Sequence, residues 1–202
     1  MMAAVITLEN VTRRYGGFTA VDRVSFTAHP GRVTGFLGPN GAGKSTSMRI
    51  MVGLTSADEG QALIGGHRFA DIPNPSRHVG VLLDASAQHA GRTGREILRL
   101  SADTMGVGKE RVEAMLALVG LDGVEAKRRV RNYSLGMRQR LGIANALLGD
   151  PPVLVLDEPV NGRDPPRIHR MRGVLRSFAA GGGPSLLAPS PLHAVASPSL
   201  LH

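Results

Sequence analysis

Residues 38–46 read GPNGAGKST, a segment whose residue types and spacing suit the binding of phosphate groups. It fits the pattern G-x-x-x-x-G-K-[ST], in which glycines let the backbone curl so that successive N–H groups point at phosphate oxygens. A helix that begins at this loop would add the positive end of its dipole. The predicted phosphate-binding residues are Gly38, Pro39, Asn40, Gly41, Ala42, Gly43, Lys44, Ser45 and Thr46.

The side chains at the end of this loop suit different groups of a nucleoside triphosphate. Lys44 would contact the β and γ phosphates, Ser45 would offer its hydroxyl to a magnesium ion, and Thr46 would donate to the α phosphate. Lysine occurs at positions 44, 109 and 127 alone, so a chance lysine in this pattern is rare, roughly below one in a hundred. A flexible glycine turn is therefore the weaker interpretation.

A second segment, VLVLDE at 153–158, supplies carboxylates for the same chemistry. The uniformly apolar run 153–156 predicts a parallel strand that is covered on both faces. Asp157 and Glu158 then stand at its C-terminal end, where open α/β sheets bind ligands. An acidic pair directly after a buried strand is costly unless a cation meets it. The two segments together predict a site for ATP or GTP with magnesium.

Composition restricts the class of protein. The chain has 202 residues, of which 42% are hydrophobic and 20% are charged, as expected for one globular domain. Its formal charge is +8, but basic residues are dense only at 127–140, and the aromatic content is 3%. Nucleic-acid binding is therefore a minor hypothesis. No cysteine is present, which excludes thiolate metal sites, and the apolar runs are shorter than a membrane-spanning helix.

Hydrophobic periodicity predicts the elements that position these motifs. Alternation over 5–26 around Tyr15-Gly16-Gly17 predicts an antiparallel pair of strands, and 33–37 and 79–83 are further strand candidates. In the helix after the phosphate loop, Met48, Met51 and Leu54 have helical spacing and are predicted to be buried.

Segments 92–121 and 134–148 are predicted to be helical, with Ser134 as an N-cap, so that a helical insertion occupies about 85–148. Residues 177–202 contain no charged side chain and carry prolines at 184, 189, 191 and 198. This proline spacing argues against both a helix and a central strand. We therefore predict one domain over 1–178 and a poorly ordered tail over 179–202.

From about residue 5 to about residue 176, the chain resembles the ATP-binding subunits of ABC transporters. The resemblance is carried by the phosphate loop, by YSLGMRQR at 133–140, which is similar to the family signature, by LDEPVNGRDP at 156–165, and by Tyr15. It implies an α/β P-loop NTPase fold with a mostly parallel central sheet, an N-terminal antiparallel layer and a helical insertion. The wording GFLGPNGAGKST and NGxDP is similar to bacterial subunits associated with drug, antibiotic or peptide export.

The resemblance also implies roles for individual residues. Tyr15 matches the aromatic residue that stacks on adenine, although a tyrosine that anchors a turn is the alternative. Asp157 would hold magnesium, and Glu158 would act as the general base for the attacking water. Ser134 and Gly136 would contact the γ phosphate of ATP held by an opposite subunit. Asp164 would lie at the seam of that head-to-tail dimer.

The chain departs from the family pattern at several places, two of which concern predicted site residues. Asp84 stands where family members usually carry glutamine, with Gln88 four residues later, and we predict Asp84 as a further magnesium ligand. The family also has a later strand that ends in a histidine facing the γ phosphate. By register that position falls near Ser190, and His193 is close to it. The C-terminus therefore resembles that of a truncated or frameshifted subunit.

The resemblance implies an ATPase with two cofactors, ATP and Mg²⁺, and with two kinds of partner. A second ATP-binding subunit would close head to tail on the nucleotide, and a membrane permease would receive the resulting motion. The chain would then work at the cytoplasmic face of the membrane. Two alternatives stay open at this point: a truncated or defective subunit that binds nucleotide without turnover, and a soluble ABC-type ATPase that acts on the ribosome or nucleic acid.

Overall fold

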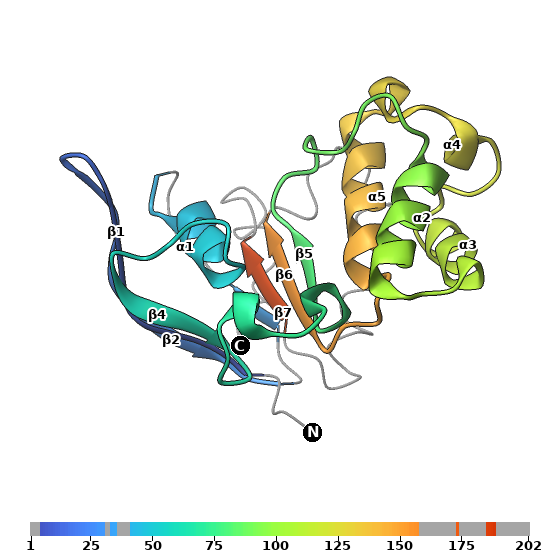
Figure 1. Cartoon of the computed structure of the whole chain (residues 1–202). Helices are drawn as coiled ribbons and strands as arrows, with labels where there is room; N and C mark the ends of the chain where they lie inside the picture. The colour runs from blue at the N-terminus through green and yellow to red at the C-terminus, as the bar shows by residue number, and fades with distance from the viewer. Residues whose placement is uncertain (1–4, 31–32, 36–40, 158–172, 174–184, 189–202) are drawn as a thin grey trace.

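Two β-sheets with helix α1 between them make up one part of the molecule, and a group of helices covers the other face of the second sheet (Figure 1). The computed structural model describes residues 5–30, 33–35, 41–157, 173 and 185–188. This arrangement is the α/β fold with an antiparallel layer that the sequence predicts.

The first sheet is antiparallel and has the strand order β2-β1-β4. Its strands are β1 (Ile6–Tyr15), β2 (Phe18–Ala28) and β4 (Glu59–Ile64). β1 and β2 form a hairpin in which Tyr15 pairs with Phe18. Gly16 in the turn has a φ of 58°, a conformation that glycine adopts without a steric penalty. The antiparallel pair predicted around this turn is confirmed.

The second sheet contains the strands from which the nucleotide motifs emerge. Its order is β3-β7-β6-β5, with β3 at Val33–Gly35, β7 at Ser185–Ala188, β6 at Val153–Asp157 and β5 at Val79–Leu82. Each neighbouring pair of these strands is parallel. Because the carboxyl ends of parallel strands share one edge, the C-terminal ends of β3 and β6 lie at the same edge of the sheet.

Strand β7 corrects the prediction made for the C-terminal segment. Ser185–Ala188 pairs with β3 on one side and with β6 on the other, so it is a central strand. The prediction that proline spacing prevents a central strand is wrong here, because Pro184 and Pro189 flank these four residues and do not interrupt them. The rest of 179–202 and the domain boundary at 178 lie outside the described residues.

Helix α1 (Lys44–Met51) follows the phosphate loop and packs between the sheets. Met48 and Met51 are buried, as predicted, but Leu54 is 68% exposed, so that part of the prediction is wrong. The helix ends at Met51, and Gly53 with a φ of 71° turns the chain. Helical spacing therefore no longer applies at position 54.

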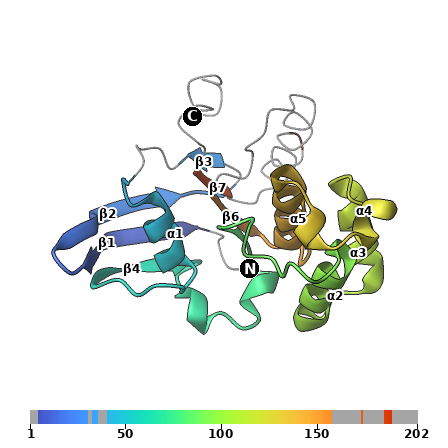
Figure 2. The same ribbon diagram turned by 90° about the horizontal axis from the view of Figure 1, so that it is seen from above.

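The helices between β5 and β6 form the predicted insertion (Figure 2). They are α2 (Gly94–Met105), α3 (Lys109–Leu118), α4 (Val124–Lys127) and α5 (Leu135–Leu147). Among the described residues, 3₁₀ turns occur before β5 at Phe69–Asp71 and Pro75–Arg77, and before α5 at Val130–Asn132. A capping box begins α2: the Glu96 N–H donates to the Thr93 hydroxyl (3.2 Å), and the Thr93 N–H donates to the Glu96 carboxylate (2.8 Å).

Two hydrophobic cores lie on the two faces of strand β6. Val153 and Val155 pack in the core that contains α1 and the antiparallel sheet. Leu154 and Leu156 pack in the core built by the helices of the insertion. Because side chains alternate along a strand, one apolar run fills both cores. The prediction of a strand covered on both faces is confirmed.

Strand β5 packs closely on helix α5 at Gly80, and a substitution at this position tests the packing. A Cβ at this position would meet the carbonyl oxygen of Ala146 in α5 and would lie 2.6 Å from Leu154 Cδ2. We expect Gly80→Ala to lower the free energy of unfolding by about 1–3 kcal/mol, as overpacking does, when measured by urea denaturation. Gly17→Ala is the control, since a Cβ there meets no atom within 4 Å. Equal stability of the two variants would contradict the close packing of β5 on α5.

Candidate nucleotide-binding site

The N-terminus of α1, where the phosphate-loop sequence ends, has no side-chain cap among the described residues. Its N-cap Gly43 has a φ of 76°, and neither a capping side chain nor an acidic residue in the first turn occupies this end within the described chain. A Cβ on Gly43 would meet the carbonyl oxygen of Ala20 at the start of β2, so only glycine fits here. The first N–H groups of a helix have no partner inside it, and they suit an anion.

The contact that unites the two predicted motifs is a hydrogen bond between Ser45 and Asp157. The Ser45 hydroxyl donates to Asp157 Oδ2 at 2.5 Å, across 112 positions of sequence. The N-terminus of α1 and the end of β6 therefore meet at one edge of the parallel sheet. A hydroxyl and a carboxylate side by side are hard oxygen ligands of the kind that Mg²⁺ prefers. The residues present thus fit a magnesium ion that accompanies a bound triphosphate.

The structure describes some of the other predicted residues of this site, and the rest lie outside its described part. Gly41 has a φ of 86°, and Lys44 is the partly buried first residue of α1. Residues 38–40, Glu158, Asp164, Ser190 and His193 lie outside the described residues, so their predicted roles stay predictions.

Asp84 lies in a tight turn after β5. Its Oδ1 accepts hydrogen bonds from the Ser86 hydroxyl (2.6 Å) and the Ser86 N–H (2.7 Å). These two bonds hold the pKa of the Asp84 carboxyl below its ordinary value. The bond from the Ser86 hydroxyl contributes most, the bond from the Ser86 N–H follows, and the charge of Arg49 contributes less. The carboxylate is therefore ionised at neutral pH, but one of its oxygens is already used. Its role as a magnesium ligand stays a prediction.

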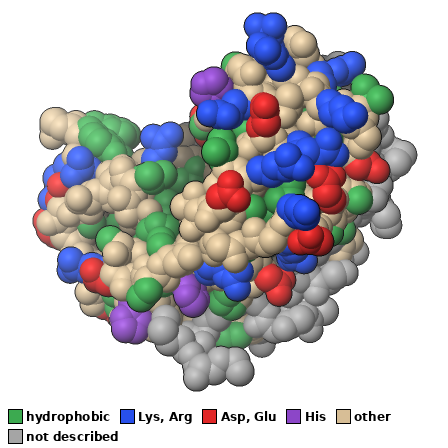
Figure 3. All heavy atoms as spheres, turned by 45° about the vertical axis from the view of Figure 1, so that its right-hand side comes forward, with side chains coloured by type: hydrophobic (Ala, Val, Ile, Leu, Met, Phe, Trp, Pro, Cys, Tyr) green, Lys and Arg blue, Asp and Glu red, His purple; other side chains and the backbone are tan. Residues whose placement is uncertain are grey.

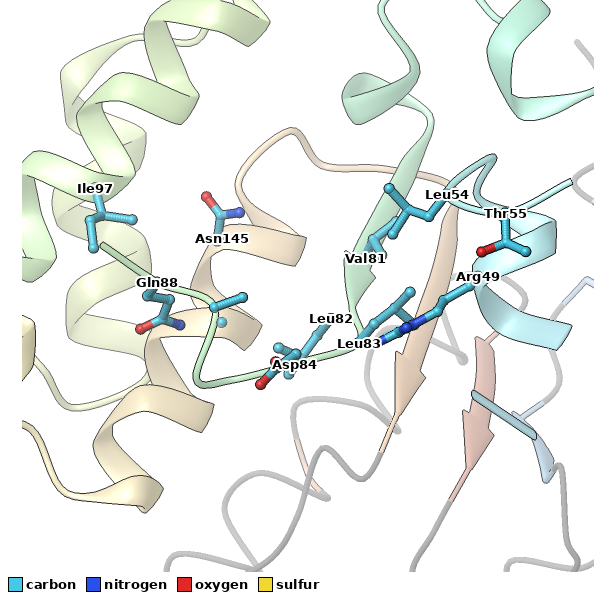
Figure 4. A pocket seen from close by; sticks show the side chains of 12 residues that line it. Arg49, Leu54, Thr55, Val81, Leu82, Leu83, Asp84, Gln88, Ile97 and Asn145 are labelled. Atoms are coloured by element: carbon cyan, nitrogen blue, oxygen red, sulfur yellow. The ribbon is translucent and has the colours of Figure 1, made fainter. Parts of the chain in front are cut away.

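Asp84 and Arg49 line a pocket of about 440 Å³ at the end of β5 (Figure 4). The pocket lies between α1 and α5, and its apolar lining includes Leu82. Gln88 also lines it and donates from Nε2 to the Arg138 carbonyl of α5 at 2.8 Å. This contact was not predictable from the sequence, because a single glutamine in a loop carries no signal for its partner.

The predicted signature segment begins α5. Ser134 is the N-cap, as predicted, and its hydroxyl accepts a hydrogen bond from the Met137 N–H at 3.3 Å. Ser134 and Leu135 are exposed, and a Cβ on Gly136 would meet no atom within 4 Å. Another molecule can therefore approach the positive end of this helix.

The phosphate-loop helix and the signature helix lie on opposite sides of the parallel sheet. Residues of α1 belong to the core on one face of β6, and residues of α5 belong to the core on the other face. Figures 1 and 2 show the same separation. The N-termini of α1 and α5 therefore do not face each other within a single hydrophobic core.

Tyr15 is at the end of β1 and is 48% exposed. The guanidinium of Arg13 lies over its ring, 4.7 Å from the centroid, in a cation–π contact. An exposed ring in this hairpin is available for stacking, but Phe18 on the facing strand is also exposed. Phe18 is thus an alternative aromatic surface that the sequence motifs did not indicate, and the predicted contact of Tyr15 with adenine stays a prediction.

Basic side chains gather on the outer surface of the helical insertion (Figure 3). Lys127, Arg128, Arg129 and Arg131 are exposed. Arg95 is paired instead with Glu113 through two hydrogen bonds of 2.7 and 2.8 Å. The first part of the dense basic stretch 127–140 is thus on the surface, whereas Arg138 and Arg140 are half-buried, and nucleic-acid binding remains a minor hypothesis.

A phosphate-loop sequence that leads into a helix, with a carboxylate at the end of another strand of the same parallel sheet, defines a P-loop nucleotide-binding domain. Residues 21–161 match the family model described as ABC transporter. This chain therefore belongs to the ABC transporter family, as an ATP-binding domain, and the predicted resemblance is confirmed.

Known relatives agree with this assignment. The uncharacterised ABC transporter ATP-binding protein YhcH of Bacillus subtilis (strain 168) is 42% identical over 194 residues, 95% of this chain and 63% of that protein. The bacitracin transport ATP-binding protein BcrA of Bacillus licheniformis is 39% identical over 180 residues, 88% of this chain and 58% of that protein. The chain thus spans less than two thirds of the length of these relatives.

The solved structure of an ATP-binding subunit of an ABC transporter is similar with a TM-score of 0.84 at 28% identity, over 95% of this chain and 81% of that one. The predicted P-loop α/β fold is therefore confirmed. In the described part of the chain, no helix has the length and apolarity that crossing a bilayer requires.

Proposed function

We propose that this chain binds ATP with Mg²⁺ and hydrolyses it to drive transport through a partner membrane permease. The observation that carries the proposal is the hydrogen bond between Ser45 and Asp157, because it joins the phosphate loop to the acidic end of β6. Transport is supported by relatives such as the bacitracin transport protein. The proposed direction, export, rests on the similarity of the phosphate-loop sequence and of NGRDP to those of bacterial export subunits.

The residues of the site would divide the chemistry among them. Lys44 and the N–H groups at the start of α1 would bind and orient the phosphates. Ser45 and Asp157 would hold the magnesium ion, with Asp84 as a further candidate ligand. When bound, that ion neutralises negative charge on the phosphates. Glu158 would accept a proton from the attacking water as the general base.

A second copy of the chain, or a related subunit, would complete the site. Ser134 and Gly136 lie at an exposed helix N-terminus on the opposite side of the sheet from α1. Head-to-tail closure would bring this end of one copy to the γ phosphate held by the other, with Asp164 at the seam. ATP then favours the closed state by binding it more tightly, and hydrolysis releases it.

The permease would place the chain at the cytoplasmic face of the membrane. Neither alternative is favoured. The bacitracin relative is a subunit of a transport system, which argues against action on the ribosome, and the presence of Ser45, Asp157 and Glu158 in the sequence argues for turnover.

Hydrolysis by the purified chain is the direct test. We expect Mg²⁺-dependent release of phosphate from ATP, and we expect Glu158→Gln to lower kcat about hundredfold, the usual contribution of a general base. The variant should still bind ATP, because glutamine leaves the phosphate loop intact. Equal background rates for the two proteins, with ATP bound by both, would reject the hydrolase and favour a subunit that binds without turnover.

A further inference from the structure

The Arg140 side chain links the first turn of α5 to the end of α3. Its Nη1 donates to the carbonyl oxygens of Val119 (2.9 Å) and Gly120 (2.7 Å), and its Nε donates to the carbonyl of Gly136 (3.4 Å). Val119 is the C-cap of α3, where carbonyl groups have no partner within the helix. One guanidinium therefore joins Gly136 to the C-cap carbonyl of α3 and to the carbonyl of the residue that follows it.

Arg111 makes the reciprocal contact at the other end of the same helix pair. It lies in the first turn of α3, and it donates to the carbonyls of Leu147 (3.0 Å) and Leu148 (3.3 Å). These are the last residue and the C-cap of α5. A positive charge near a helix C-terminus is favourable, because it meets the negative end of the helix dipole. Helices α3 and α5 thus each carry an arginine that caps the other.

The two arginines contact opposite ends of α5. Arg140 acts beside Gly136, two residues after the N-cap Ser134, whereas Arg111 acts at the far end of α5. Gln88 adds a second contact near the N-terminal end of α5, because its amide donates a hydrogen bond to the Arg138 carbonyl. The first turn of α5, which would meet the γ phosphate, is therefore fixed to α3 and to the loop after β5.

We infer that Arg140 is a positioning residue for the signature segment. It holds the first turn of α5 in the place set by the end of α3, so that Ser134 and Gly136 are ordered before a nucleotide-bearing partner arrives. Preorganised donors lose less freedom on binding, and this favours the closed state in which hydrolysis takes place. The inference rests on the proposed function, but the order of the first turn can be measured without nucleotide.

The chemistry of arginine is specific for this contact. A guanidinium is planar and presents several N–H donors in a fixed geometry, which lets one side chain serve carbonyls on both sides. The ammonium group of lysine keeps the charge but is a single point at the end of a flexible stem. We therefore expect Arg140→Lys to lose the bond to Gly136 while it keeps a cation near α3. Arg111→Lys is the matched control, since it makes the same change at the other end of α5.

The test compares Arg140→Lys and Arg111→Lys in the full chain by thermal unfolding, amide hydrogen exchange without nucleotide, and ATP hydrolysis. For Arg140→Lys, the Met137 and Arg138 amides should exchange about tenfold faster, the factor for one lost hydrogen bond to a charged group. Its kcat should fall about tenfold, with KM for ATP changed less than about twofold, because the phosphate loop is untouched. Arg111→Lys should lower the melting temperature similarly but leave kcat and those amides unchanged.

Arg140→Gln, whose amide keeps a donor, is the second variant and should give the same separation, with all rates measured below the melting temperature of the weakest protein. Unchanged exchange of the Met137 and Arg138 amides in both Arg140 variants would overturn the inference. So would losses of kcat that follow the melting temperature equally for Arg140 and Arg111 variants. If the unmodified chain hydrolyses no ATP, the proposed function fails, and the exchange rates alone then decide whether Arg140 orders this turn.

Discussion

Lys44→Ala is expected to lower kcat/KM for ATP about thousandfold, because it removes charge-assisted hydrogen bonds to two phosphate groups from a partly desolvated site. Most of this loss should appear as weaker binding of ATP in the presence of magnesium, measured by titration calorimetry. Lys44 is the first residue of α1, and its side chain is partly buried. Truncating it leaves the backbone N–H groups of the helix in place, so residual binding should persist.

Lys109→Ala is the matched control for this variant. Lys109 is also the first residue of a helix, α3, but its side chain is exposed, and α3 packs in the core on the other face of β6. Its replacement should leave ATP binding within about twofold and stability within about 0.5 kcal/mol, as is usual for surface positions. If Lys44→Ala bound ATP with unchanged affinity, the assignment of 38–46 as a phosphate loop would be wrong, and the transport proposal would fail with it.

Asp157→Asn should lower kcat about thousandfold at saturating ATP, since a carboxylate ligand supplies several kcal/mol of the charge balance around a catalytic magnesium ion. The concentration of Mg²⁺ needed for half-maximal activity should rise. An asparagine amide oxygen can still accept the hydrogen bond from Ser45, so the contact of 2.5 Å between α1 and β6 has a neutral replacement. Binding of ATP without magnesium should therefore change little.

Asp122→Asn removes the same charge at an exposed position in the helical insertion, and it should leave the magnesium dependence unchanged. A titration of hydrolysis rate against Mg²⁺ for both variants and the unmodified chain makes the comparison. Identical magnesium curves for Asp157→Asn and Asp122→Asn would show that Asp157 holds no metal. The fit of Ser45 and Asp157 to magnesium would then have to be abandoned, even if Lys44 proved essential for binding ATP.

Local features of this protein follow from its sequence because neighbours along the chain decide them. The hairpin at Gly16, the N-cap at Ser134 and the two-faced strand β6 are all confirmed. Each rests on a short-range rule: a turn residue, a capping hydroxyl, or an apolar run. The phosphate loop is also read from consecutive residues, and its binding of phosphate stays a prediction.

Contacts between distant parts of the chain depended on the tertiary structure. A parallel sheet specifies neither the order of its strands nor their partners through periodicity alone, so the insertion of β7 between β3 and β6 was not predictable. The contact of Ser45 with Asp157 and the linkage of α3 to α5 by Arg140 have the same origin. The sequence indicated which residues have the chemistry suited to phosphate and metal, whereas packing of distant elements decided which of them meet, because each such contact depends on the whole fold.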